Sequence, residues 1–351
     1  MHVVLAFNLR ESAGGNGASS YSTIDDRFAE WDDIQTIQAV QSALAKRYRV
    51  TLVNADLNAF ESFRNLRPDF VFNLAEGLNG ASREAQVPAL LEMLGIPYTG
   101  SDPVTLGICL DKRRTKEILA YHRIPTGRFV TVNSAAELPG RLRYPLIVKP
   151  ILEGSSKGVT DRALVRDRSA LRRQVSWALE TYRQPVLVEE FLPGREFTVA
   201  LLGNGSQPRV LPIVEIDFAT LPAGANPIYS YEAKWIWDTE EAPLSIFACP
   251  ARLDPVLQDR IEELCRRAFT VLGCRDWCRI DVRLDADGNP HVIELNPLPG
   301  ILPRPEQNSC FPKAARAAGL SYDELILAVA DTACRRFHLA EGEGDERRCL
   351  L

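Results

Sequence analysis

The 351-residue chain lacks the features that mark several large classes of protein. Its net charge of −5 gives no basic surplus, on which nonspecific nucleic-acid binding depends. No apolar run approaches the ~20 residues that a membrane helix needs. The short apolar run at residues 2–7 has neither the basic start nor the apolar length of a signal peptide. We therefore predict a cytoplasmic protein that binds neither nucleic acid nor membrane.

Cysteines are few and scattered, which bears on metal binding and on the redox compartment. The chain has eight of them, and Cys274 and Cys278 lie four residues apart. No second pair completes a zinc-binding pattern, and buried thiols are common in reduced cytoplasmic proteins. We predict reduced core thiols instead of zinc ligands.

What the chain does have is the composition of a large globular protein. It is 46% hydrophobic and 25% charged, and its length exceeds one ordinary domain. Residues 1–107 alternate strand, helix and strand, which is typical of an open α/β sheet. Residues 108–200 and 201–338 each mix helices and strands, and residues 339–351 form a polar tail. The patterns predict strands at 3–7, 50–53, 70–74, 144–150 and 186–191, and helices at 34–48, 85–94, 112–122, 170–182, 255–272 and 322–337.

The clearest chemical signal is a predicted hairpin in the last quarter of the chain. Residues 278–284 and 291–295 alternate apolar and polar side chains, and a turn rich in Asp, Gly and Asn joins them. Since side chains repeat every second residue along a strand, Asp281 and Glu294 can lie on one face. Two carboxylates and the amide of Asn296 suit Mg²⁺, which binds oxygen ligands together with substrate phosphates. The alternative is a surface hairpin with charged outer positions.

A strand that ends in a lysine and continues into a loop of small residues gives a second signal. Lys149 ends that strand, and the loop at 153–158, called here the small-residue loop, contains two glycines and two serines. Such a loop can close N–H groups and hydroxyls on phosphate oxygens. Its spacing is not that of a P-loop, and an ordinary turn is the alternative. Lys112 opens a predicted helix upstream and offers another cation.

These motifs, taken in order, make the chain resemble an ATP-grasp ligase, and within that superfamily the D-alanine–D-alanine ligases. The resemblance runs from about residue 70 to about residue 333. Its strongest pieces are LGIPYTGS (94–101), LDK (110–112), VKP (148–150), EGSS (153–156), VEEFL (188–192), GREFTV (194–199), YEAK (231–234), GC (273–274), RID (279–281), ELN (294–296) and PG (299–300). It implies a three-domain α/β ATP-grasp fold, with an N-terminal open α/β domain on the substrate side followed by a central and a C-terminal α+β domain.

The resemblance also implies a role for each motif. For ATP, the corresponding residues are Lys112, Lys149, Ser155, Ser156 and Lys234 at the phosphates, Glu189, Glu190 and Leu192 at adenine, and Glu196 at the ribose. For Glu190 the alternative is a solvated strand end. The residues that match ligands of Mg²⁺, or of Mn²⁺ in its place, are Asp281, Glu294 and Asn296. The catalytic group would comprise Ser155, Arg279 and the N–H of Gly300, the last two stabilising a tetrahedral oxyanion.

The chain departs from the family on the substrate side. Family members carry Gly-Gly-x-Ser-x-Glu after the first strand, and its glutamate binds the ammonium of the first amino acid. That signature is missing here, with Glu11 as a stand-in, and a pocket without the carboxylate cannot strongly favour an ammonium. Trp235 replaces a family tyrosine, and an indole donates but does not accept. Arg304 lies in a longer turn before Ser309; it could hold a carboxylate or be a solvated loop residue. Glu84 completes the predicted substrate side.

The resemblance implies an ATP-dependent carboxylate–amine ligase that works through an acyl phosphate, in which the small-residue loop and residues 219–237 are candidate lids. We expect small-molecule amino-acid or acid substrates other than two D-alanines, and a homodimer by family precedent. A natural-product amino-acid ligase, such as one that acts on a mycosporine core, is one specific possibility. A divergent D-alanine–D-alanine ligase is the alternative within the class. A nucleotide-binding protein without turnover is the alternative outside it.

Overall fold

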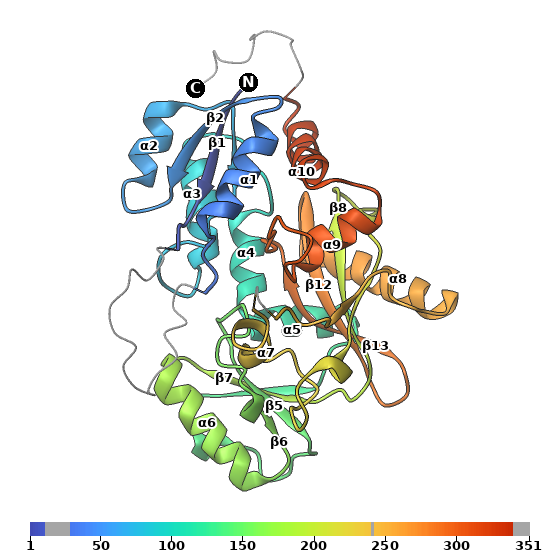
Figure 1. Ribbon diagram of the computed structural model, residues 1–351. Helices are drawn as coiled ribbons and strands as arrows, with labels where there is room; N and C mark the ends of the chain where they lie inside the picture. Colours follow the sequence, from blue (N-terminus) through green and yellow to red (C-terminus); the bar gives the residue numbers. More distant parts are fainter. Residues whose placement is uncertain (11–28, 240–241, 340–351) are drawn as a thin grey trace.

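The computed structural model describes residues 1–10, 29–239 and 242–339, and its elements form three sheets (Figure 1). In the first sheet β1 (His2–Phe7) lies between β2 (Arg49–Asn54) and β3 (Phe70–Asn73), all parallel. Alternate residues of β1 enter two different cores, because successive side chains point to opposite faces. Helix α1 covers one face, and helices α2 and α3 cover the other. The helical elements of this region are α1 (Ile34–Leu44), α2 (Ala59–Leu66), η1 (Arg83–Ala85) and α3 (Gln86–Met93).

The second sheet, at the bottom of Figure 1, is antiparallel and has the order β4-β7-β5-β6. Helix α6 (Arg168–Tyr182) covers it through a core that includes Leu171 and Val175. The small-residue loop follows β5 and therefore begins where that strand leaves the sheet. Other elements here are β4 (Phe129–Val132), η2 (Ala135–Glu137), β5 (Leu146–Pro150), η3 (Asp161–Ala163), β6 (Leu164–Val165) and β7 (Val186–Glu190). Helices α4 (Pro103–Leu110) and α5 (Lys112–Tyr121) precede this sheet in the chain, and their buried side chains join the core beneath the third sheet.

The third sheet has the order β11-β10-β8-β12-β13, with β9 paired to β8. Ile280 and Val282 of β12 face the core beneath α8, so the alternate residues Arg279, Asp281 and Arg283 point to the opposite side. The elements of this part are β8 (Glu196–Leu202), β9 (Arg209–Val210), β10 (Val214–Ile216), η4 (Phe218–Thr220), α7 (Tyr231–Trp235), β11 (Phe247–Ala248), α8 (Pro255–Val271), β12 (Trp277–Leu284), β13 (Pro290–Asn296), α9 (Cys310–Ala317) and α10 (Tyr322–Arg336).

Side-chain caps explain where most of the long helices begin. The carboxylate or hydroxyl of the preceding residue accepts a backbone N–H that has no partner inside the helix. Such caps are Asp33 for α1, Asp102 for α4, Asp111 for α5, Asp167 for α6, Asp254 for α8 and Ser321 for α10. The cap at Asp111 is the one that matters for the site, because it sets Lys112 at the first helical position of α5.

The structure confirms the predicted fold class and the predicted hairpin. The expected domain limits at 107 and 200 fall inside α4 and β8, respectively. Because β8 completes the ladder of β12, we propose that the last domain begins before β8. The tail at 340–351 and Glu11 lie outside the described residues. In the part of the chain that is described, no helix is long and apolar enough to cross a bilayer, and the seven cysteines are free thiols.

Candidate active site

A cavity of about 670 Å³ lies where the three parts of the chain meet. Its lining combines the small-residue loop, the ends of β5 and β7, the inward face of β12 and the turn after β13. The predicted site residues that line it are Lys112, Lys149, Ser155, Ser156, Glu189, Glu190, Leu192, Glu196, Lys234, Trp235, Arg279, Asp281, Glu294, Gly300, Arg304 and Ser309. Glu84 and Asn296 line a neighbouring pocket of about 30 Å³, which shares Lys112 and Glu294 with the cavity.

The predicted carboxylate pair forms across the hairpin. Asp281 and Glu294 are direct partners in the β12–β13 register, and a bulge follows Asp281. Asn296 Nδ2 lies 3.3 Å from Asp281 Oδ2, and Lys112 Nζ lies 3.5 Å from Glu294 Oε2. Burial alone would raise the pKa of Glu294, but Lys112, Lys149 and Arg279 lower it to about 2. Glu294 is therefore ionised at any physiological pH.

Arg279 projects from the same face of β12 as Asp281. Its Nε and Nη2 lie 3.2 and 3.1 Å from the two Asp281 oxygens. The pKa of Asp281 is raised chiefly by burial and also by Glu294, and Arg279 opposes both effects. Since a guanidinium carries five N–H donors, Arg279 can hold Asp281 and still donate to a second oxygen.

Two buried lysines flank one glutamate at the floor of the cavity. Lys149 Nζ lies 3.4 Å from Glu189 Oε2, and Lys116 Nζ lies 2.5 Å from Glu189 Oε1. Lys116 also donates to Thr126 at 2.6 Å. The sequence interpretation missed Lys116, although it follows Lys112 by four residues and so shares its face of α5. Because Glu189 is engaged by both lysines, its side chain balances their charge; contact with adenine remains a prediction.

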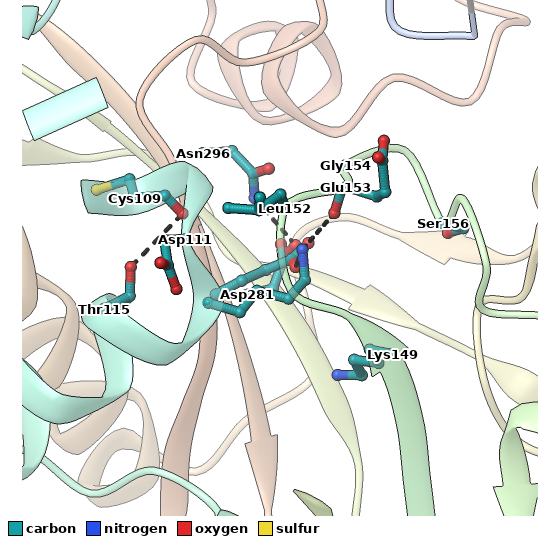
Figure 2. A network of polar contacts seen from close by, with 12 residues as sticks. Cys109, Asp111, Thr115, Lys149, Leu152, Glu153, Gly154, Ser156, Asp281 and Asn296 are labelled. Carbon is teal, nitrogen blue, oxygen red and sulfur yellow. Dashed lines mark hydrogen bonds and ion pairs between the residues drawn. The ribbon is translucent and has the colours of Figure 1, made fainter. Parts of the chain in front are cut away.

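The small-residue loop closes over this floor. Figure 2 shows Glu153, Gly154 and Ser156 arching past Asp281 and Asn296, with Lys149 at its strand end below. Ser155 and Ser156 have φ of 49° and 60°, in the left-handed region. The hydroxyl of Ser156 donates to the carbonyl of Tyr229 at 2.8 Å. Lys234 Nζ lies 3.3 Å from Ser155 Oγ, and Trp235 Nε1 donates to the Ser155 carbonyl at 3.1 Å. The two candidate lids therefore contact each other.

Glu196, which also lines the cavity, is paired with an arginine. Arg283 Nη1 donates to Glu196 Oε2 at 2.6 Å, and the guanidinium carbon lies 4.4 Å from the Phe191 ring centroid and 5.0 Å from that of Phe218. Burial raises the pKa of Glu196 while Arg283 opposes the rise. The sequence interpretation missed Arg283, which the period of β12 places two residues beyond Asp281 on the same face.

Comparison with known proteins identifies the family. A family model described as "D-ala D-ala ligase C-terminus" matches residues 118–330. The chain belongs to the D-alanine–D-alanine ligase family. It is an ATP-grasp ligase that forms carbon–nitrogen bonds with release of ADP.

Individual relatives agree with this placement. A D-alanine–D-alanine ligase of Bordetella petrii is 37% identical over 273 residues, which cover 77% of each chain. An uncharacterized protein of Sinorhizobium fredii, y4sG, is 38% identical over 267 residues, 76% of this chain and 75% of that one. The crystal structure of D-alanine–D-alanine ligase from Bacillus anthracis complexed with ATP matches with a TM-score of 0.72 at 23% identity. It covers 97% of this chain and 99% of that one, and it supports the fold.

The substrate side is where this ligase differs from the family pattern quoted above. Ser309 Oγ donates to the Gly300 carbonyl at 3.1 Å and accepts from Leu302 N–H at the same distance, which closes the turn between them. Within that turn the N–H of Arg304 donates to Gln307 Oε1 at 3.0 Å. The turn is thus folded and presents Arg304 on the cavity wall.

One expectation about the ligase's substrate side was wrong. The missing signature predicted a pocket without a substrate-side carboxylate, yet Glu30, Asp32 and Asp33 all line the cavity. They lie at the turn into α1, more than twenty residues after the first strand. An isolated parallel β-bridge between Leu9 and Asp32 holds this turn next to the end of β1. Asp33 is committed to capping α1, and burial raises the pKa of Asp32 to about 7. The sequence offered no periodic or motif signal for Glu30.

Proposed function

We propose that this family member joins a carboxylic acid to the amine of an amino acid through an acyl phosphate, and that its substrates are not two D-alanines. One observation carries the proposal. A single cavity is lined by cations and carboxylates that suit ATP phosphates, at Lys112, Lys149, Lys234 and the Asp281–Glu294 pair, and also by Trp235 and the turn that holds Arg304.

The phosphate end fits ATP. Lys149 and Lys234 line the cavity together with the small-residue loop, whose N–H groups and Ser155 hydroxyl suit phosphate oxygens. Burial, and secondarily Arg279, lowers the pKa of Lys234 to about 8. Lys234 forms no ion pair with a carboxylate among the described residues, so its burial costs free energy, which an incoming phosphate would offset. Glu196, held by Arg283, is available for the ribose hydroxyls.

The donor set fits a magnesium ion shared with the nucleotide. Asp281 and Glu294 face each other. Asn296 lies beside Asp281 with its Nδ2 3.3 Å from Asp281 Oδ2, so turning the amide would bring a third oxygen ligand to the pair. Among the described residues no three His, Cys, Asp or Glu side chains gather to hold a metal alone. The remaining ligands would be phosphate oxygens and water, as Mg²⁺ prefers. When bound, Mg²⁺ or Mn²⁺ would neutralise phosphate charge during transfer.

The proposed reaction has two steps. The substrate carboxylate attacks the γ-phosphorus of ATP, the bond to the bridging oxygen breaks, and ADP leaves with the lysines neutralising its charge. The neutral amine then attacks the acyl carbonyl, the bond from the carbonyl carbon to the phosphate oxygen breaks, and phosphate leaves with the proton that the amine loses as the amide forms. Arg279 and the N–H of Gly300 would stabilise the oxyanion, a contribution of ~3 kcal/mol for a donor of this kind. Closure by the small-residue loop and α7 would exclude the water that hydrolyses acyl phosphates.

Two hypotheses about the substrates of this ligase differ: a natural-product ligase and a divergent D-alanine–D-alanine ligase. Arg304 on the cavity wall supports an amine partner with a free carboxylate, and Trp235 supports an acid partner other than D-alanine. A natural-product ligase, such as a mycosporine-type enzyme, would satisfy both. Identity of 37% with a D-alanine–D-alanine ligase favours the divergent-ligase alternative. The presence of Arg279, Asp281, Glu294 and Asn296 together argues against a protein without turnover. A homodimer remains a prediction from the family.

An ADP-release screen over pairs of acids and amino acids, with product masses, tests the proposal. We expect ADP to be released with one class of acid–amine pair and the product mass to equal the sum of the two substrates less one water. Absence of ADP release with every pair, D-alanine included, would contradict the proposed function.

A further inference from the structure

The carboxylate of Glu30 faces the cavity and has no part in the reaction described above. Its side chain is only 7% exposed. Arg83 Nη2 lies 2.8 Å from each oxygen, and Arg83 Nε lies 3.2 Å from Oε2. The N–H of Gly154 donates to Oε1 at 2.8 Å, and Lys157 Nζ lies 3.2 Å from Oε2. A carboxylate accepts about four hydrogen bonds, so these donors fill its capacity.

Arg83 reaches from η1 to the small-residue loop as well as to Glu30. Its Nη1 donates to the Leu152 carbonyl at 2.8 Å, and its Nη2 lies 3.7 Å from a Glu153 carboxylate oxygen. Lys157 also forms an ion pair with Glu153. Burial would raise the pKa of Glu30, but Arg83 and Lys157 outweigh it and lower the pKa below its usual value. The charges are therefore compensated within the network.

The space around Gly154 gives independent evidence that the loop backbone lies close to the Glu30 carboxylate. A Cβ added there would lie 2.5 Å from Glu30 Oε1, inside van der Waals contact. The backbone of Gly154 is outside the left-handed region, so conformation alone does not demand glycine. What glycine permits is the close approach of the loop backbone to the carboxylate.

We propose that Glu30 and Arg83 form a clasp that holds the small-residue loop closed against the N-terminal part of the chain. The clasp rests on the proposed function, in which this loop covers the phosphates. Both are positioning residues, because they act through the loop. The oxygens of Glu30 take loop and arginine donors, so they do not receive a substrate ammonium. This agrees with an acid substrate that is not recognised through an α-amino group.

Hydrogen exchange of the full-length protein tests the clasp without knowledge of the substrates. The amides of residues 152–158 are followed in the wild type and in Arg83→Gln and Gly154→Ala, each with and without a nonhydrolysable ATP analogue and Mg²⁺. Gly140→Ala is the control, because an added Cβ meets nothing within 4 Å there. We expect exchange in this segment to be at least about tenfold faster in both clasp variants, as loss of bonds to a charged group predicts. The analogue should bind them more weakly.

The outcomes separate the clasp from the proposed function. Wild-type exchange at residues 152–158 in Arg83→Gln and Gly154→Ala would overturn the clasp. Faster exchange spread evenly over the whole chain would also overturn it, because the residues would then support the fold and not the loop. A third outcome is faster exchange at residues 152–158 in the variants than in the wild type, with no ADP release by the wild type for any substrate pair. That result would refute the proposed function and support the clasp.

Discussion

The charge of the site is concentrated where two carboxylates meet across the hairpin. Asp281 and Glu294 were predictable because period two and turn chemistry together fix which residues share a face. Lys149 was predictable for a similar reason, as a cation at the end of an apolar strand. Glu30, Arg83 and the partnership of Lys116 with Glu189 were not, because each contact joins segments far apart in sequence. Local pattern carries no information about which distant segment supplies a partner.

Asp281→Asn and Glu294→Gln should each lower ADP release by at least about a hundredfold while leaving the fold intact. Each variant removes a negative oxygen ligand from the proposed Mg²⁺ site. Steady-state ADP release at low millimolar Mg²⁺ checks this, with Asp287→Asn in the exposed turn of the same hairpin as the matched control. Near-wild-type turnover in both site variants would rule out the metal assignment.

Nucleotide affinity should fall as pH rises through about 8. Burial, followed by Arg279, lowers the pKa of Lys234 to about 8, so below this pH the free enzyme carries the charge that phosphates require. Above it the lysine is neutral, and binding must first take up a proton, which weakens affinity by up to about tenfold per pH unit. Calorimetry from about pH 7 to pH 9.5 checks this.

Lys234→Met provides the comparison for that pH profile. The variant should bind the nucleotide more weakly at pH 7 and show little change across the same range, because the titrating group is gone. A wild-type affinity that stays constant above pH 8 would show that Lys234 keeps its proton in the free enzyme.

At the scale of elements, most segments with a clear helical or strand pattern were predicted, and some elements without such a pattern were not. The predicted helices at 255–272 and 322–337 correspond to α8 and α10. Helix α9 and strand β8 escaped prediction: β8 is buried along its whole length, and a continuously buried run shows no alternation. The predicted domain limit at residue 200 falls inside β8 for the same reason, because the sequence pattern did not mark a strand there. The pairing of β8 with β12, which places β8 in the third sheet, joins distant segments and cannot be inferred from local sequence.

Helix α10 is tied to the rest of the fold by a buried ion pair, which gives a stability prediction. Arg336 Nη2 lies 2.6 Å from Asp276 Oδ2 and also donates to the carbonyls of Tyr98 and Gly100. Asp276 is fully buried. Arg336→Gln should lower the free energy of unfolding by about 3–5 kcal/mol, because it leaves the buried Asp276 carboxylate without its positively charged partner.

Urea unfolding of that variant checks the prediction. The control is Arg335→Gln on the same helix, whose exposed side chain contacts Thr332 one turn away; it should change the free energy of unfolding by less than about 0.5 kcal/mol. Equal effects of the two substitutions would mean that the Asp276 pair does not anchor α10.

At the scale of the whole molecule, three parts of the chain line one cavity. The predicted roles of these parts differ in how much of each role can be inferred from local sequence. The predicted ATP side follows the family's motifs, so a role could be proposed for each of its residues from the sequence, and those roles stay predictions. The proposed substrate side is assembled from the turn into α1, the candidate lid around α7 and the turn after β13, which meet only in the folded chain. Substrate identity therefore depends on contacts that form only in the tertiary structure.

The most direct test of the central claim compares kcat/KM for D-alanine alone with kcat/KM for a panel of other acids, each paired with a panel of amino acids. In the proposed clasp Glu30 offers no free oxygen to an ammonium, Trp235 stands where the family pattern has a tyrosine, and Arg304 lines the same cavity. We predict that D-alanine is a poor substrate and that an acid not recognised through an α-amino group gives the highest value with an amino-acid partner. If D-alanine instead proves the best substrate, at about 10⁴ M⁻¹s⁻¹ or more, the substrate proposal is contradicted and the chain is a divergent D-alanine–D-alanine ligase.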